Sequence, residues 1–294
     1  MAIDYHQLKA RIFPEVRQRY TTRDTALYAL SLGLGRDPVD ERTLPFVYEG
    51  TALGMQTLPT MAAVLGYPGF WARQTDTGID WVRLVHGEQR LVVHRTLTSS
   101  ASVVGRNRIT HLVDKGDEKG AIIVIERRIE DEASNLLATL QQISFCRGDG
   151  GFSRLQGGQP SDPPLSPLPA TPEDRAPDLV VDQPTRSESA LLYRLLGDDN
   201  PLHADPAVAK AAGFERPILH GLASYGLAGY ALIRHCAGND PAQLLSLDVR
   251  FSAPVYPGET LRTEVWRDGK VLQFRARVLE RDRIVLSHGR ARLA

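Results

Sequence analysis

Residues 192–226 read LYRLLGDDNPLHADPAVAKAAGFERPILHGLASYG, and this stretch decides how the rest of the chain is interpreted. Pro201 and Pro206 lack an amide hydrogen, and each disfavours the α conformation in the residue before it. The segment therefore cannot be one smooth helix. We expect a bent loop between helical pieces, which can point several polar side chains at one spot.

Three polar side chains fall within six residues of this loop: Asp198, Asn200 and His203. An Asp and a His within reach of one water form a general acid/base pair, which suits the addition or removal of water. The same run is also ordinary turn chemistry, since Asp and Asn cap their own backbone and Pro fixes φ. A second histidine, His220, and the apolar helix that follows it favour the catalytic interpretation.

A long apolar helix is expected from Gly221 to Arg234, with large apolar residues at helical spacing and many small residues between them. Gly226 and Gly229 each weaken a helix by ~1 kcal/mol against alanine, so we expect a sheet to approach the helix closely there. The first amides of a helix lack partners and carry its positive dipole end. The Gly221 amide can therefore stabilise negative charge on a carbonyl oxygen, although a plain helix start is the alternative.

Residues 193–206, with 213–214 and 217–222, resemble the signature of the R-specific enoyl-CoA hydratases, also called hydratase 2 or MaoC-like dehydratases. Residue types and spacings agree over roughly thirty positions. The resemblance implies an α+β hot-dog fold, in which an antiparallel sheet wraps a central helix. It also implies an enzyme of the hydro-lyase class, working in fatty-acid or related acyl-CoA metabolism.

The implied reaction is the reversible hydration of a trans-2-enoyl-CoA to a (3R)-3-hydroxyacyl-CoA. Negative charge builds on the thioester oxygen as water adds at C3, and the Gly221 amide suits that charge. Asp198 and His203 would hold the water between them, and which of them is the base stays open. We expect Asn200 to position the water or the thioester.

The composition of the chain limits the classes of partner that we expect. The 294 residues suggest about two domains, and 35 basic residues balance 35 acidic ones, so neither nucleic acid nor a polybasic membrane contact is expected. Cys146 and Cys236 lie far apart without metal-ligand spacing. Residues 1–20 lack the apolar core of a signal peptide, and no stretch is long enough to span a membrane. We expect a cytoplasmic protein with reduced thiols.

A proline-rich run divides the chain. Seven prolines between residues 156 and 177 cannot supply ladder hydrogen bonds and favour an extended connector. We therefore expect an N-terminal unit over 1–155, a linker over 156–177 and a C-terminal unit over 178–294. Residues 22–33 can be laid over 185–197, but the Asp and His are missing from the first copy. This fits a double hot-dog, two fused units of which only the second is catalytic.

The first half also resembles the non-catalytic half of the two-hot-dog hydratase 2 enzymes. It is rich in β-branched or alternating runs, at residues 81–85, 91–95, 102–105, 121–125 and 139–145. Its only plausible central helix, Leu58 to Leu65, is short. A sheet with a shortened helix would leave an open groove for a medium to long or bulky acyl chain. The expected strands of the second half are 244–251, 260–266, 271–279 and 283–287.

The resemblance further implies contacts to the CoA ester from His86, Gly87 and Lys115 of the first half and Phe251 of the second. Lys115 lies in a glycine-flanked turn, where it suits a phosphate, although a solvated turn lysine is an equally good interpretation. An acyl-CoA thioester is thus the expected partner. Because isolated hot-dog units usually pair, we also expect a homodimer of the fused chain.

No metal or cofactor is implied. His203, Asp205 and His220 form only a weak ligand pattern. Three other cations are expected to be solvated or ion-paired: Arg127, Arg128 and Arg147.

Two alternatives of other classes stay open. A hot-dog thioesterase needs a carboxylate near the scissile carbonyl, and the His203 partner five residues after Asp198 argues against it. A non-catalytic acyl-CoA binding or scaffold protein would not need Asp198, Asn200, His203 and Gly221 together. A thioesterase would release free thiol, and a binder would show affinity without turnover.

Overall fold

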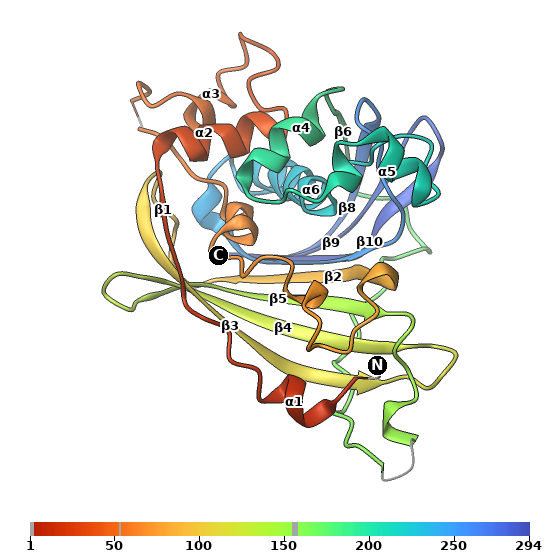
Figure 1. Ribbon diagram of the computed structural model, residues 1–294. Helices are drawn as coiled ribbons and strands as arrows, with labels where there is room; N and C mark the ends of the chain where they lie inside the picture. The colour runs from red at the N-terminus through yellow and green to blue at the C-terminus, as the bar shows by residue number, and fades with distance from the viewer. Residues whose placement is uncertain (1–2, 53, 155–157) are drawn as a thin grey trace.

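The computed structural model describes residues 3–52, 54–154 and 158–294. Within these ranges, ten strands form one continuous antiparallel sheet (Figure 1). In spatial order the strands are β1 (Val16–Tyr20), β3 (Ala101–Asp114), β4 (Ala121–Asp131), β5 (Leu136–Cys146), β2 (Leu84–Val93), β7 (Leu244–Phe251), β10 (Arg283–Leu293), β9 (Val271–Val278), β8 (Thr260–Asp268) and β6 (Leu179–Pro184). The first five strands come from the first half of the chain and the last five from the second.

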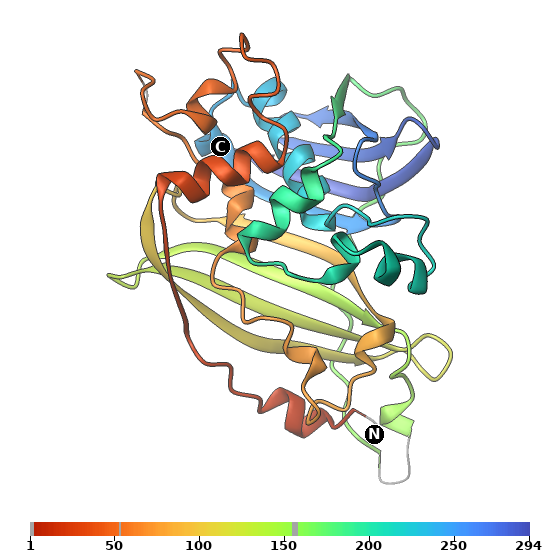
Figure 2. The same cartoon turned by 45° about the horizontal axis from the view of Figure 1, so that its top comes forward.

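Short helices and one long helix complete the described part of the chain. They are α1 (Tyr5–Lys9), α2 (Thr22–Ser31), α3 (Leu44–Val47), η1 (Pro59–Val64), η2 (Trp71–Arg73), η3 (Trp81–Arg83), η4 (Phe152–Arg154), α4 (Ser189–Tyr193), η5 (Arg194–Leu196), η6 (Pro201–His203), α5 (Pro206–Ala211), α6 (Gly221–Cys236) and η7 (Pro241–Gln243). Figure 2 shows α2 to α6 gathered on one face of the sheet. This is the predicted double hot-dog arrangement.

The two halves meet where β2 pairs with β7. Leu91 lies opposite Leu247 and Glu88 lies opposite Arg250, so the ladder runs from one half into the other. Glu88 is only 5% exposed, and its carboxylate accepts hydrogen bonds from Arg250 at 2.7 and 3.0 Å and from Arg90 at 2.9 Å. A buried carboxylate held by two guanidinium groups favours one register over its neighbours.

Helix α6 is the central helix of the second half, and it extends two residues past the predicted end. At Gly229 an added methyl would lie 2.8 Å from Thr60 and 3.1 Å from Leu247 of β7. At Gly226 it would lie 2.8 Å from Leu32, just after α2. The predicted close approach is therefore confirmed for the sheet at Gly229, but at Gly226 the neighbour is the first half of the chain.

The first half has only the six-residue 3-10 helix η1 where a central helix was expected. The chain beyond it covers the sheet: Trp71, Ala72 and Ile79 are buried in one apolar cluster with Ile123 and Ile125 of β4. The predicted short helix is confirmed, but the part of the sheet beyond η1 is not an open groove. The segment that follows the short helix fills it.

Most of the predicted strands are present, with differences that have local causes. Residues 84–85 and 91–93 of two predicted runs belong to one strand, β2, whereas residues 81–83 form the 3-10 turn η3 before it. The edge strands β1 and β6 were missed, because each is short and has only one buried residue; β1 is mostly polar, and β6 ends in Asp182, Gln183 and Pro184. β3 is longer than predicted, since outward-facing arginines such as Arg106 and Arg108 interrupt its apolar pattern.

Residues 158–177 carry no helix or strand and cross from one half to the other. Asp162 accepts hydrogen bonds from the Leu112 amide at 2.8 Å and from Lys9 at 2.9 Å. Farther along, the Ala170 carbonyl accepts from Gln273 of β9 at 3.3 Å. The expected boundary between residues 155 and 156 lies outside the described residues.

Candidate active site

The loop after α4 brings the candidate catalytic side chains together. Gly197 has a φ of +111°, which an L side chain rarely adopts, and it turns the chain sharply after η5. Asp198 accepts a hydrogen bond from the Asn200 amide at 3.3 Å, and Asn200 caps η6 by accepting from the Leu202 amide at 3.1 Å. The predicted bent loop between helical pieces is confirmed.

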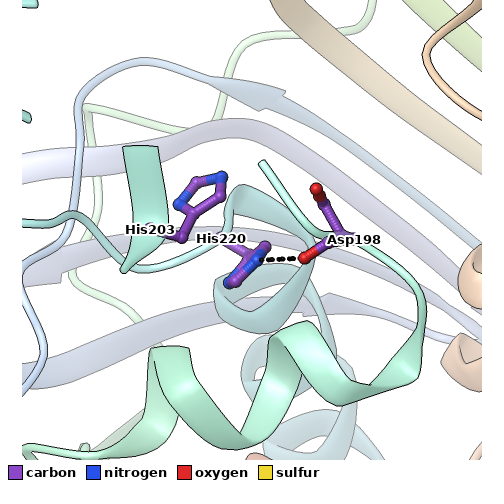
Figure 3. A group of neighbouring side chains, drawn as sticks. All are labelled: Asp198, His203 and His220. Carbon is purple, nitrogen blue, oxygen red and sulfur yellow. Dashed lines mark hydrogen bonds between the residues drawn. The ribbon is translucent and has the colours of Figure 1, made fainter. Parts of the chain in front are cut away.

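Asp198, His203 and His220 lie side by side in Figure 3, with one ligand-type atom of each within 4.8 Å of the others. His203 is 9% exposed, and its Nδ1 lies 2.9 Å from the Ile218 carbonyl oxygen. A carbonyl only accepts, so a neutral His203 carries its hydrogen on Nδ1. Its Nε2 is then an unprotonated acceptor, the form that a general base needs.

The pKa of His203 follows from these surroundings. Burial lowers this pKa from its usual 6.5, while the bond to the Ile218 carbonyl and the charge of Asp198 oppose the change. The net direction is downward. His203 is therefore neutral at neutral pH.

His220 lies in the site, but its contact with His203 was not predicted from the sequence. Its ring stacks on that of His203 with centroids 3.7 Å apart, and Tyr193 covers it from α4 at 4.9 Å. Its Nε2 lies 3.4 Å from the backbone oxygen of Asp198. Burial, reinforced by His203, lowers the pKa of His220 to about 2, so this ring stays neutral and holds the loop by packing. Its place directly before Gly221 was the only signal in the sequence.

Gly221 begins α6, as predicted. Among the described residues no group accepts a hydrogen bond from its amide. A methyl group on Gly221 would lie 3.1 Å from the ring of Phe251, which is tighter than ordinary contact. The amide is thus available, and the glycine leaves room for Phe251.

His86 and Phe251 meet across the junction of the two halves, with ring centroids 4.8 Å apart in an edge-to-face contact. Burial lowers the pKa of His86 to about 4, and its Nε2 is buried without a partner among the described residues. Gly87 lies at a bulge in β2, where an added methyl would sit 2.2 Å from the ring of Phe145. The structure therefore brings His86, Phe251 and Gly221 into one continuous surface.

Lys115 does not join that surface. It is exposed in the turn between β3 and β4, with its amide bonded to the Gly120 carbonyl at 2.9 Å. Three strand spacings separate β3 from β2, which is about 14 Å across the sheet. Only a long ligand can contact Lys115 and His86 together.

A metal would find its ligands in Asp198, His203 and His220. Metal-binding nitrogens use a lone pair in the plane of the ring, whereas the two histidines here face each other with a 25° angle between planes. Asp205, the third member of the pattern considered from sequence, instead caps α5 through the Ala207 amide at 2.8 Å. The arrangement suits acid/base chemistry better than a metal.

One expectation about the cations is wrong. Arg127 is neither solvated nor ion-paired: it is 4% exposed, and among the described residues it contacts no carboxylate. The neighbouring Arg128 is ion-paired with Glu130 at 3.2 Å, as expected. Successive side chains of a strand point to opposite faces, so β4 places Arg127 and Arg128 on opposite faces of the sheet. The sequence analysis did not predict this difference between the two arginines.

No helix in the described ranges is long and apolar enough to cross a membrane.

Comparison with known proteins agrees with the fold. Residues 169–288 match the MaoC like domain, and residues 18–148 match the MFE-2 hydratase 2 N-terminal domain. The chain is 29% identical to the crystal structure of a MaoC-like dehydratase from Phytophthora capsici, with a TM-score of 0.84 over 99% of both chains. The fold and the site thus define a MaoC-like dehydratase with two hot-dog units.

Two curated relatives narrow this further. A peroxisomal enoyl-CoA hydratase 2 of Arabidopsis thaliana is 39% identical over 95% of this chain and 92% of its own. The 3-hydroxyacyl-thioester dehydratase Y of Mycobacterium tuberculosis is 38% identical over 98% of each chain. The chain belongs to the enoyl-CoA hydratase 2 family, and the predicted hydro-lyase class is confirmed.

Proposed function

We propose that this protein hydrates trans-2-enoyl-CoA esters reversibly to (3R)-3-hydroxyacyl-CoA. The observation that carries the proposal is the pairing of His203, held as a neutral base by the Ile218 carbonyl, with the carboxyl group of Asp198. The unpaired Gly221 amide supplies a donor for the thioester oxygen at the start of α6. Membership of the hydratase 2 family supports the same reaction.

His203 would act as the base. A carboxylate only accepts hydrogen bonds, so Asp198 orients the water through one hydrogen while Nε2 of His203 takes the other as a proton. The water oxygen then bonds to C3, and the C2=C3 electron pair shifts to form an enolate whose oxygen accepts from the Gly221 amide. The imidazolium of His203 returns its proton to C2, so that one water is added and the site is regenerated.

The remaining site residues have supporting roles in this proposal. Asn200 uses its carbonyl oxygen to cap η6, which leaves its NH₂ group for the water or the thioester. His86, Gly87 and Phe251 would line the path of the CoA ester at the junction of the halves. Lys115 would contact a phosphate at the far end of the ligand.

We further propose that the chain consists of a binding unit over 1–155, a linker over 156–177 and a catalytic unit over 178–294.

We also propose that the protein is a homodimer and that it is located in the cytoplasm. Both cysteines are free thiols, as is usual in a reducing compartment. Size-exclusion chromatography with light scattering tests the dimer. A fluorescent fusion tests the location against the peroxisome that the Arabidopsis relative's name specifies.

The proposal is tested by following the loss of enoyl-thioester absorbance with short and long trans-2-enoyl-CoA. The configuration of the product at C3 is read with R- and S-specific dehydrogenases. Turnover to the R product is expected. Release of free thiol would identify a thioesterase, and binding without turnover would identify a scaffold, so either result would overturn the proposal.

A further inference from the structure

Arg127 is a buried cation in the interior of the first half. It lies on β4 opposite Asn107 of β3 and Leu140 of β5, and Leu140 in turn lies opposite Leu91 of β2. This row of side chains faces the covered side of the sheet, beneath η1. Burial lowers the pKa of Arg127 to about 10, so the side chain still carries its charge at neutral pH.

Only one end of this guanidinium is bonded. Its Nη1 donates to the carbonyl oxygens of Ala63 and Leu65, at 3.0 and 2.7 Å, and so caps the end of η1. Its Nε is buried and has no partner among the described residues. Burying an unpaired charge costs several kcal/mol, and a bond to a carbonyl does not neutralise it. The guanidinium of Arg127 therefore has a buried positive charge and a free donor with which it can bind an anion.

The unbonded edge of Arg127 is the edge that binds carboxylates elsewhere in this chain. Four arginines donate from Nε and Nη2 together to one carboxylate. Arg262 and Arg281 meet both carboxylate oxygens in the fork geometry, whereas Arg108 and Arg250 each donate twice to a single oxygen. These pairs are Arg108 with Glu126, Arg250 with Glu88, Arg262 with Asp182 and Arg281 with Glu259. In Arg127 the same edge meets no acidic side chain from the part of the chain that the structure describes.

Two tyrosines place Arg127 beside the active site. The guanidinium carbon lies 5.3 Å from the centre of the Tyr67 ring. Burial raises the pKa of Tyr67 to about 12 and raises that of Tyr193; the negative charge of Asp198 adds to both rises, and the positive charge of Arg127 opposes them. Both tyrosines therefore lie within electrostatic reach of the catalytic carboxyl group and of the buried cation.

Arg127 also lies within electrostatic reach of His86, which lines the proposed substrate path. After burial, which is the main cause, its positive charge helps to lower the pKa of His86. A ligand that passes between His86 and Asp198 into the first half would approach the open edge of Arg127. In the proposed orientation the phosphates of a CoA ester lie toward the exposed Lys115, so the far end of the acyl group is the part of the ligand that would reach Arg127.

We propose that Arg127 determines substrate specificity, and that the preferred acyl group ends in a carboxylate that binds the Nε and Nη2 edge of this arginine. This inference rests on the proposed hydratase function, and it names the class of substrate: ω-carboxy trans-2-enoyl thioesters. Tyr67, stacked on the guanidinium, positions it. A free carboxylate is the other source of the same chemistry.

The test compares two ladders of trans-2-enoyl-CoA esters of increasing length, one ending in a methyl group and one in a carboxylate. We expect the wild type to prefer the carboxylate by about ten- to a hundredfold in kcat/KM over one range of lengths, as a charge-assisted pair would give. Arg127→Met should lose this preference and keep turnover of the methyl series. Arg128→Met, which changes the neighbouring arginine on the opposite face, should keep the preference.

The other possible outcomes distinguish the inference about Arg127 from the hydratase proposal. A wild type that turns over the methyl series but never prefers the carboxylate overturns the inference and leaves the hydratase proposal standing. Competitive inhibition by octanoate that Arg127→Met abolishes, with no preference in the ladder, would mean that a free carboxylate is the ligand and would also overturn it. If Arg127→Met does not fold, Arg127→Lys keeps the charge without the fork and should lower the preference.

If the wild type turns over neither series of esters, the hydratase proposal itself is contradicted. Calorimetric binding of the two kinds of ester to the wild type would still decide the inference, because the preference for a carboxylate does not need turnover.

Discussion

The two halves share one sheet but differ in what covers it. The second half has the 16-residue helix α6, a bent loop held against its first turn, and two stacked histidines. The first half has the six-residue η1 and a long segment that packs Trp71 and Ile79 onto its strands. A central helix thus provides a hot-dog unit with the positive end of a helix dipole, and a loop can place polar side chains next to that end. Without that helix, the first half covers its strands with a packed segment instead.

The largest difference between the halves is expected for the proposed catalytic carboxyl group, that of Asp198. Asp198→Asn removes the acceptor that orients the water, and kcat should fall roughly a thousandfold. The matched control is Asp37→Asn, an exposed carboxylate in the corresponding loop of the first half, which should keep wild-type activity. Steady-state rates and unfolding midpoints of both variants check this. Equal losses of kcat in the two variants would contradict the assignment of catalysis to the second half alone.

A smaller loss is expected at the start of α6. In Gly221→Ala the new methyl presses on Phe251, and the amide moves away from the thioester oxygen, so kcat/KM should fall about ten- to a hundredfold. The unfolding midpoint should change little, because a helix start tolerates alanine. Activity equal to the wild type would show that this amide does not hold the enolate.

A third difference separates a half-buried histidine, His86, from an exposed one, His94, within the first half. His86 has its pKa depressed from 6.5 to about 4, so the unfolded chain binds its proton more readily. Its contribution to folding stability is present in full above pH 6.5 and is lost as pH falls through about 4, an effect of about 3 kcal/mol at most.

Denaturant titrations between pH 7.5 and 4 should therefore show a weaker pH dependence in His86→Asn than in the wild type. His94→Asn, at an exposed position of the same half, should match the wild type. If His86→Asn also follows the wild-type curve, His86 is not buried as a neutral ring.

The smallest effect is expected at the turn between β3 and β4. Lys115→Ala should raise KM for CoA esters about three- to fivefold and leave kcat unchanged, since an exposed charge contributes little. Esters of N-acetylcysteamine, which lack the phosphates, should be unaffected. Lys119→Ala, in the same turn, is the control, and an equal rise in KM there would show a general effect of charge.

The sequence predicted the loop, the helix α6 and the pairing of Asp198 with His203, because each has a local signature in prolines, small residues or spacing. It did not predict the stack of His220 on His203, since packing of a ring across a turn leaves no pattern. The edge strands were missed because half-exposed strands read as polar loops. Arg127 was misjudged because a charge looks the same in sequence on either face of a strand.

The central chemical claim is that His203 is neutral at pH 7, with its hydrogen on Nδ1 and an unprotonated Nε2 beside Asp198. The direct measurement is ¹⁵N NMR of protein labelled at histidine, with the His203 signals assigned by their loss in His203→Gln. The account predicts an Nε2 that is mainly unprotonated at pH 7 and whose pKa lies below the usual 6.5. A hydrogen on Nε2 at pH 7, whether from the other tautomer or from a charged ring, would contradict it.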